Sequence, residues 1–121
     1  MYDINKCQKI AIEQGALHLG LSNPKQSVGY LELNPKQSLT LHNRPAVEKL
    51  TQVKGKCDMI VYKDSKGEII TLNEGDTLTI EPAGTYHIHN NPYDEASLTY
   101  WDFDGDITHL IEQLRSSDKK E

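Results

Sequence analysis

Two histidines, His87 and His89, stand two positions apart shortly after a tight turn, and this spacing could bring two imidazoles to one site. Residues 75–81 alternate polar and apolar side chains, which is typical of a half-buried strand. Pro82 and Gly84 then turn the chain sharply. If a second strand follows, both histidines lie on the same face of it. Two imidazoles aimed at one point indicate a metal site or a proton-transfer site.

A second group of polar residues precedes this segment. Strand alternation places Thr40, His42 and Arg44 on one face, and Glu48 and Gln52 on one face of the next strand. A barrel lined by these side chains and by the two later histidines would be too polar for a dry core. An unpaired buried polar group costs roughly 1 to 3 kcal/mol. Such a lining indicates a ligand, an ion or ordered water in the interior.

Short alternating runs with turn signals between them follow one another from residue 27 onward. We expect strands at 28–33, 38–44, 47–53, 57–63, 68–72, 76–81, 86–90 and 97–103. About eight short strands within about 75 residues are typical of an antiparallel sandwich or barrel.

The residue patterns at the two ends of the chain differ from the strand pattern of its middle. Residues 1–26 predict an N-terminal arm, or a strand that ends near Ile12. Residues 106–115 carry apolar side chains at helical spacing, which predicts a short α-helix packed on the sheet, with His109 off its apolar face. We therefore expect one domain, with a barrel over residues 27–104 and a helix and tail over 105–121.

The two polar segments resemble the two motifs of the cupin superfamily. The first motif reads Gly-x5-His-x-His, three or four residues, Glu, six residues, Gly; this chain has His42-x-Arg44, three residues, Glu48, six residues, Gly55. The second reads Gly-x5-Pro-x-Gly-x2-His-x3-Asn; this chain has Gly75, six residues, Pro82-x-Gly84-x2-His87-x3-Asn91. The resemblance covers roughly residues 28 to 104. With the expected helix, it implies an all-β fold: an antiparallel jelly-roll β-barrel followed by a short C-terminal α-helix.

This chain departs from the family pattern at one position that bears on chemistry. Arg44 stands where the family has its second histidine, and a guanidinium cannot donate a lone pair to a metal. By the resemblance, the remaining metal ligands are His42, Glu48 and His87, a set that suits iron, manganese, zinc or nickel. The possible fourth ligands are Gln52 and His89. The alternative is a metal-free site in which Arg44 forms a buried ion pair with Glu48.

The resemblance implies a small metal-binding cupin, and two kinds of function follow from it. The first is an enzyme of isomerase or dioxygenase type that acts on a small polar or anionic molecule. A sugar phosphate is one candidate, because residues 38–55 are similar to the cupin module of mannose-6-phosphate isomerase-type proteins, and a carboxylate is another. The second is a non-catalytic, metal-free cupin that binds a small anion through Arg44. In either case Tyr86 could line the mouth of the site.

Composition restricts the partners. The chain has 121 residues and a formal net charge of -5 without a basic stripe, which argues against nucleic acid as a partner. No apolar run reaches the ~20 residues of a membrane span, and the two isolated cysteines predict no disulfide framework, so we expect a cytoplasmic protein. Jelly-roll cupins commonly pair through an exposed sheet, which predicts a homodimer. The apolar residues expected there are Val28, Tyr30, Leu39 and Leu41, and Trp101 is assigned to sheet packing or to a subunit interface.

Overall fold

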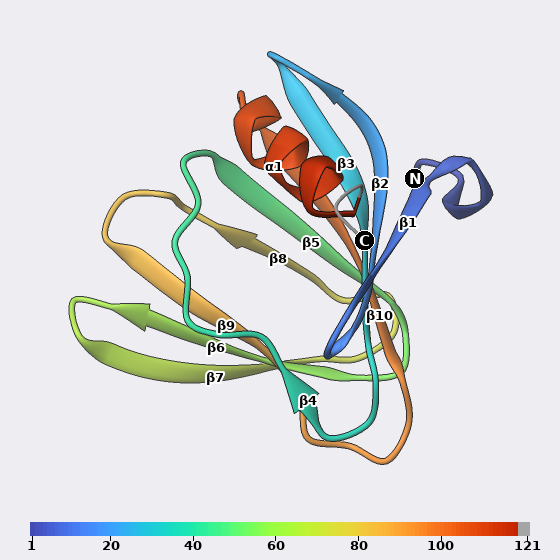
Figure 1. Cartoon of the computed structure of the whole chain (residues 1–121). Coiled ribbons are helices and arrows are strands. Elements are labelled where there is room, and N and C mark those ends of the chain that lie inside the picture. Colours follow the sequence, from blue (N-terminus) through green and yellow to red (C-terminus); the bar gives the residue numbers. More distant parts are fainter. Residues whose placement is uncertain (119–121) are drawn as a thin grey trace.

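The computed structural model describes residues 1–118, and it folds them into two facing antiparallel sheets with one helix beside them (Figure 1). The described residues begin with a 3-10 turn, η1 (Ile4–Lys6), and end with a helix, α1 (Thr108–Asp118). The strands between them are β1 (Gln8–Ile12), β2 (Gly15–Asn23), β3 (Gln26–Leu33), β4 (Gln37–Ser38), β5 (Val47–Lys54), β6 (Cys57–Lys63), β7 (Lys66–Leu72), β8 (Thr77–Ile80), β9 (Thr85–Asn91) and β10 (Ser97–Asp104).

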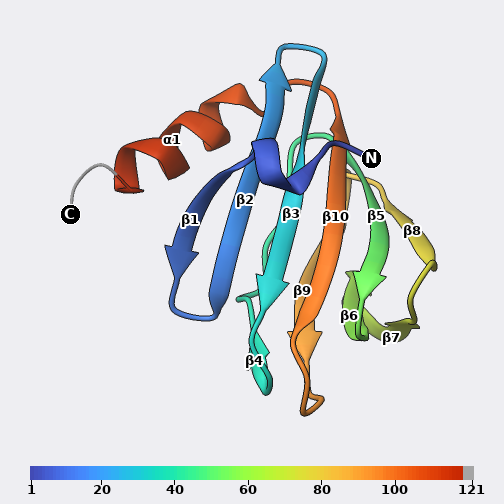
Figure 2. The ribbon, with the colours of Figure 1, turned by 90° about the vertical axis from the view of Figure 1, so that its right-hand side faces the viewer.

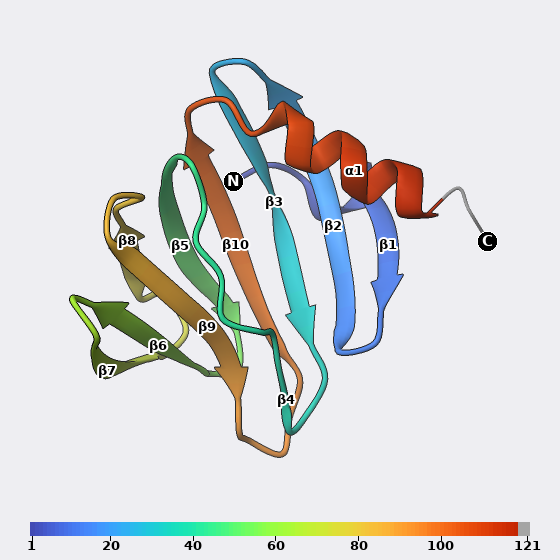
Figure 3. The same ribbon diagram turned by 60° about the vertical axis from the view of Figure 1, so that its left-hand side comes forward.

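The two sheets differ in width. The larger sheet has the strand order β1-β2-β3-β10-β5-β8, and the smaller has the order β4-β9-β6-β7. Figure 3 shows the smaller sheet in front of the β10-β5-β8 half of the larger sheet, while α1 lies across β1, β2 and β3. Both sheets are antiparallel, so the predicted all-β jelly-roll with a short C-terminal helix is confirmed.

The core lies between the sheets because apolar residues alternate along each central strand. On β5, Leu50 is fully buried between the inward-facing Glu48 and Gln52, while Lys49 points to solvent, as the alternation predicts. Leu50 is aligned with Trp101 of β10, which is also buried. The prediction that Trp101 takes part in sheet packing is therefore confirmed.

The outer face of the larger sheet is covered by the N-terminal arm, which crosses β2, β3 and β10 in Figure 2. Val28 and Tyr30 are buried there against the arm, and the Tyr30 hydroxyl donates a hydrogen bond to the backbone carbonyl of Tyr2 at 2.5 Å. Of the four residues predicted for a homodimer interface, Leu41 alone is largely exposed, and Leu39 faces the interior. The homodimer remains a prediction.

The predicted strand over residues 38–44 is wrong for most of its length. β4 covers Gln37–Ser38, and the chain then follows β9 irregularly: the Leu39 amide donates to the His89 carbonyl, and His42 pairs with His87. From Leu39 to His42 this segment advances by three residues, while its partner β9 advances by two, from His89 to His87. The segment therefore contains one extra residue, as in a β-bulge. The extra residue changes the alternation, and Thr40 is exposed rather than inward as predicted.

The ends of the chain match the predictions in part. β1 confirms a strand ending at Ile12, but β2 was not predicted. The helix begins and ends a few residues later than predicted. Residues 116–118, expected to belong to a frayed tail over 116–121, are therefore helical, and residues 119–121 lie outside the described residues. No helix within residues 1–118 has the length and apolar character needed to cross a membrane.

A substitution of Gly29 on β3 tests how tightly Trp101 packs against the larger sheet. A Cβ atom at this position would collide with the His18 carbonyl and with the Trp101 indole. We expect Gly29→Ala to lower the free energy of unfolding by about 3 kcal/mol, at the upper end of overpacking costs, because one of the two colliding groups is backbone. Urea unfolding monitored by circular dichroism measures this.

The control for this prediction is Gly67→Ala in the exposed β6–β7 hairpin. There the added Cβ would meet the ring of Tyr62, which can rotate away. Equal losses of stability in the two variants would contradict the assigned packing of Trp101 against β3.

Candidate metal centre and cavity

Two histidines of β9 form the floor of a polar cluster inside the barrel. His87 and His89 lie on the inner face of β9, as their spacing predicts, and their exposed fractions are 1% and 3%. β9 is held in place by β6, which aligns Val61 with His87 and Met59 with His89. The two ring centroids are 5.1 Å apart.

His42 joins this cluster from the segment between β4 and β5. The backbones of His42 and His87 exchange two hydrogen bonds, of 3.0 and 2.9 Å, and the ring centroids are 4.1 Å apart. His42 Nδ1 lies 2.8 Å from the Thr40 carbonyl oxygen. Because a carbonyl oxygen only accepts, Nδ1 must carry the proton, and the lone pair is on Nε2. Metal-ligating histidines commonly have this arrangement, with the other ring nitrogen bonded to a carbonyl.

Glu48 reaches the same cluster from β5. Its Oε1 lies 3.0 Å from His87 Nε2 and its Oε2 lies 3.9 Å from His89 Nε2, and the residue is 3% exposed. The shorter contact lacks hydrogen-bond geometry, because Glu48 Oε1 and His87 Nε2 both have no hydrogen-bond partner. Two donor atoms bound at right angles to one ion at about 2.1 Å would lie about 3 Å apart. The contact therefore fits two ligands of one ion better than a direct hydrogen bond.

The three imidazoles fit the same interpretation. One ligand atom from each of His42, His87 and His89 lies within 4.8 Å of the others. Donors on one ion with bonds of about 2.1 Å are separated by at most about 4.2 Å, so small side-chain rotations complete the set. Buried polar atoms without partners include both ring nitrogens of His87, His89 Nδ1 and Glu48 Oε1. A bound cation would satisfy some of these groups at once.

The protonation states also suit a metal. Burial, and after it the neighbouring His87, lowers the pKa of both His42 and His89 to about 3. For His42, the hydrogen bond to the Thr40 carbonyl opposes this shift without reversing it. Both imidazoles are therefore neutral at pH 7, the form in which histidine binds metals.

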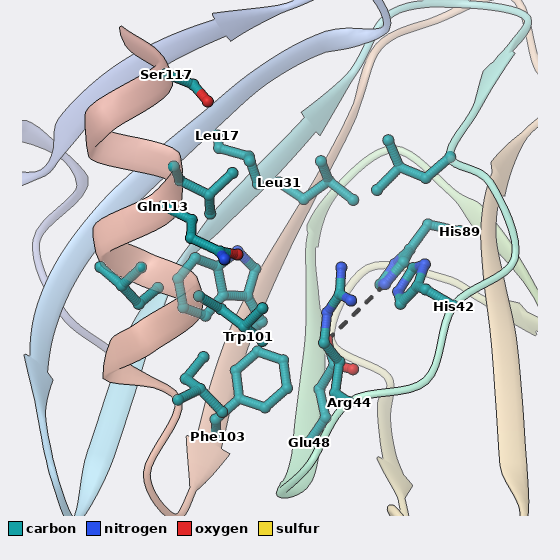
Figure 4. Close-up of a pocket in the computed structure, with 15 residues that line it drawn as sticks. Leu17, Leu31, His42, Arg44, Glu48, His89, Trp101, Phe103, Gln113 and Ser117 are labelled. Carbon is teal, nitrogen blue, oxygen red and sulfur yellow. Dashed lines mark ion pairs between the residues drawn. The ribbon is translucent and has the colours of Figure 1, made fainter. Parts of the chain in front are cut away.

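Arg44 lies beside the cluster without belonging to it. Its side chain is half-buried, and its Nη1 donates a 3.5 Å hydrogen bond to the Asn43 carbonyl. Burial lowers the pKa of the guanidinium and the charge of Glu48 raises it, but within residues 1–118 the two form no ion pair. The Arg44–Glu48 pair considered for a metal-free site is thus not formed. Figure 4 shows the guanidinium extending into the space between Trp101 and the histidines.

The other candidate residues lie apart from the cluster. The Gln52 side chain donates to the Lys54 carbonyl and to Ser97 Oγ, and it accepts from Thr99 Oγ1 at 2.7 Å, so its amide is already satisfied. Tyr86 is 51% exposed and is on the opposite face of β9 from His87. His109 is exposed on α1, as predicted.

A cavity of about 340 Å³ opens beside the polar cluster (Figure 4). One side carries His42, Arg44, Glu48 and His89. The opposite side is apolar and is formed by the inner face of the larger sheet and by α1: Leu17, Leu31, Trp101, Phe103, Ile107, Leu110, Ile111 and Leu114. The sequence analysis did not identify this wall. The apolar face of the helix was the available signal, but it was interpreted as packing on the sheet.

Comparison with known proteins identifies the fold. No model of a known family and no curated protein matches the chain. Similar solved structures include Drosophila melanogaster CENP-C bound to CAL1, with a TM-score of 0.73 and 18% identity over 84% of this chain and 82% of that one. Another structure of CENP-C is described as its cupin domain.

Larger proteins contain the same unit. A Bacillus subtilis oxalate decarboxylase matches with a TM-score of 0.76 and 15% identity over 88% of this chain and 29% of its own. A vicilin from tomato, Solanum lycopersicum, matches with a TM-score of 0.74 and 16% identity over 88% and 33% of the two chains. At these identities the likeness establishes the fold, which is the cupin jelly roll.

The buried histidines predict a pH dependence of stability. The pKa of His89 is about 3 in the folded protein and about 6.5 when unfolded, so between these values the unfolded chain binds more protons. Stability from this group is complete above pH 6.5 and is lost as pH falls towards 3. We expect His89→Gln to remove up to about 1.4 kcal/mol per pH unit of this dependence in chelator-treated protein.

Urea unfolding at several pH values between 7 and 4 measures this slope. The exposed His109→Gln serves as the matched control and should leave the slope unchanged. If His89→Gln and the wild type lose stability in parallel on acidification, the neutral state of His89 is wrong.

Proposed function

We propose that this chain is a metal-dependent cupin in which His42, His87, His89 and Glu48 hold a divalent ion, with iron, manganese, zinc and nickel as candidates. One observation carries the proposal: these side chains, buried except for the half-buried His42, converge from three segments, and several of their polar atoms lack hydrogen-bond partners. In this interpretation His89 supplies the third imidazole that the family pattern has at the position of Arg44. One imidazole would then come from the segment before β5 and two from β9, whereas the family pattern has two in its first motif and one in its second.

The proposed activity is that of a small enzyme of isomerase or dioxygenase type. When bound, the ion would act as a Lewis acid or as a site for oxygen. Arg44 would orient an anionic substrate, since a guanidinium binds a carboxylate or phosphate in bidentate fashion. The candidate substrates are a sugar phosphate, suggested by the resemblance to mannose-6-phosphate isomerase-type proteins, and a small carboxylate.

The structural neighbours support an enzymatic role without fixing the reaction. An oxalate decarboxylase and an oxalate oxidase are among them, and both are named for a carboxylate substrate. One fold hosts many functions, so the chemistry must be argued from the site. The convergent buried donors of this site are the feature that favours metal chemistry over simple binding.

A metal-free cupin that binds a small anion is the second candidate. The guanidinium of Arg44 favours it, because within residues 1–118 it forms one long hydrogen bond and no ion pair. The CENP-C neighbour, described as a cupin domain and solved bound to CAL1, is an example of a cupin that binds a protein partner. A homodimer is compatible with either candidate and is also proposed. Metal content distinguishes the two candidates.

The first test is metal content by inductively coupled plasma mass spectrometry on untagged protein. We expect near-stoichiometric metal in the wild type and at least a tenfold lower metal content in His87→Ala, because this variant removes the most buried imidazole of the cluster. Circular dichroism verifies the fold. His109→Ala, which removes an exposed histidine, should retain the metal, and equal metal content in both variants would contradict the site.

A second test asks whether His89 replaces the missing family histidine. We expect His89→Ala to weaken metal binding at least tenfold, and Arg44→His added to it to restore much of the loss, because an imidazole would return at the family position. Metal titration of the two variants measures this. If His89→Ala binds metal as tightly as the wild type, His89 is not a ligand.

A further inference from the structure

We propose that the ligand of this site is a small monocarboxylate with an apolar body, aromatic or branched, whose carboxylate binds Arg44 and whose body lies against the wall formed by the larger sheet and α1. The inference rests on the proposed function, because it places the ligand beside the same metal site. It narrows the substrate class from small anions in general to one kind of amphipathic acid.

The cavity is divided into two chemically different halves. The charged and metal-binding groups come from β9, from β5 and from the segment that precedes β5. The facing half contains the buried aromatic rings of Trp101 and Phe103 and the apolar side chains of α1. In Figure 4 these two groups of side chains lie on opposite sides of the space. A ligand that fills it must therefore be charged at one end and apolar at the other.

Arg44 determines the sign and shape of the charged end. A guanidinium has five N–H donors, and within the described chain one long contact of 3.5 Å, to the Asn43 carbonyl, uses one of them. A divalent ion at the histidines would add further positive charge, which Glu48 offsets only in part. This end of the cavity therefore requires an anion. A carboxylate offers two oxygens to the guanidinium fork, whereas a phosphate carries about two charges and three strong acceptor oxygens, more than one arginine satisfies.

The apolar wall argues against a sugar. Beyond the charged cluster, the polar lining residues are Gln113 and Ser117, both on α1. Each sugar hydroxyl placed against leucine, tryptophan or phenylalanine would lose its hydrogen bonds to water, which lowers affinity about tenfold or more per hydroxyl. An apolar body instead gains from leaving water.

The volume limits the size of the body. About 340 Å³ is near the lower end of the range of about 300–1,000 Å³ found for ligand pockets. The rings of Trp101 and Phe103 are tilted by 59° with centroids 5.7 Å apart, so a ligand ring could pack against either in an edge or offset arrangement. Phenylacetate combines one ring with one carboxylate and is a suitable probe.

The experiment is calorimetric titration of the metal-loaded protein with four probes. Phenylacetate is compared with acetate, which lacks the apolar body, with 2-phenylacetamide, which lacks the charge, and with glucose 6-phosphate. We expect phenylacetate to bind about 10- to 100-fold more tightly than acetate, because a ring is removed from water. It should also bind at least tenfold more tightly than the amide. Tighter binding of glucose 6-phosphate, or equal binding of acetate and phenylacetate, would overturn the proposal.

Substitutions test which residues bind the carboxylate and which contact the apolar body of the ligand. Arg44→Gln should weaken phenylacetate at least tenfold while the metal content stays unchanged. Leu110→Asn, and independently Leu114→Asn, both on the apolar wall, should remove the preference for phenylacetate over acetate. The matched control is Leu21→Asn, because Leu21 is 45% exposed and lies outside the cavity. Unchanged phenylacetate binding in Arg44→Gln and in both cavity leucine variants would overturn the proposal.

Metal analysis of the same samples separates this inference from the function on which it rests. Stoichiometric metal without selective phenylacetate binding would contradict the proposed ligand class and would still support the metal site. Selective binding that requires Arg44 in protein that takes up no metal would support the ligand class and overturn the metal-dependent function.

Discussion

The packing of three imidazoles, two of them buried and one half-buried, around one buried carboxylate is the constraint on which this structure depends. Several of their polar atoms lack hydrogen-bond partners, and each such atom costs roughly 1 to 3 kcal/mol when buried. The chain contains a contrasting pair on the other face of the larger sheet, where His18 Nε2 and Glu32 Oε1 lie 3.1 Å apart and do form a hydrogen bond. The same residue types can thus satisfy each other in this fold. Their failure to do so at Glu48 and His87 indicates a site shaped for a further group.

The unequal width of the two sheets explains why the cavity lies where it does. The smaller sheet covers the β10-β5-β8 half of the larger sheet, and the core between them is closely packed around Leu50 and Met59, both with no exposed surface. The other half is covered by α1, which packs on the sheet through Ile107 and Ile111. The space between the smaller sheet and α1 is left open and forms the cavity. The histidines His42 and His89 line it from one side.

The period of two residues in strands explains most of what the sequence predicts. It correctly places His87 and His89 on the inner face of β9, and Glu48 on the inner face of β5 beside Leu50. The same rule fails between residues 38 and 44, because the extra residue there is defined by pairing with β9 and leaves no trace in the local pattern. β2 did have a signal, since its leucines alternate with smaller or polar residues from residue 16 to 21. The apolar face of the helix could be predicted from the sequence. Which of its residues pack in the core and which line the cavity depends on where the smaller sheet ends, and the local sequence does not show this.

Arg44, which stands where the cupin motif has its second histidine, changes the electrostatics of the whole site. In the proposed site, His89 would supply the third imidazole from a strand face that is already buried, and the position of Arg44 would be free for a permanent cation. A guanidinium close to a divalent ion is repelled by it, and low-dielectric surroundings strengthen that repulsion. An anion between the two cations reverses the sign of the interaction. Metal and carboxylate are therefore expected to favour each other's binding, and by thermodynamic linkage the effect must be equal in both directions. In a site with the three histidines and one glutamate of the family pattern, and without the arginine, the metal alone would have to supply this attraction.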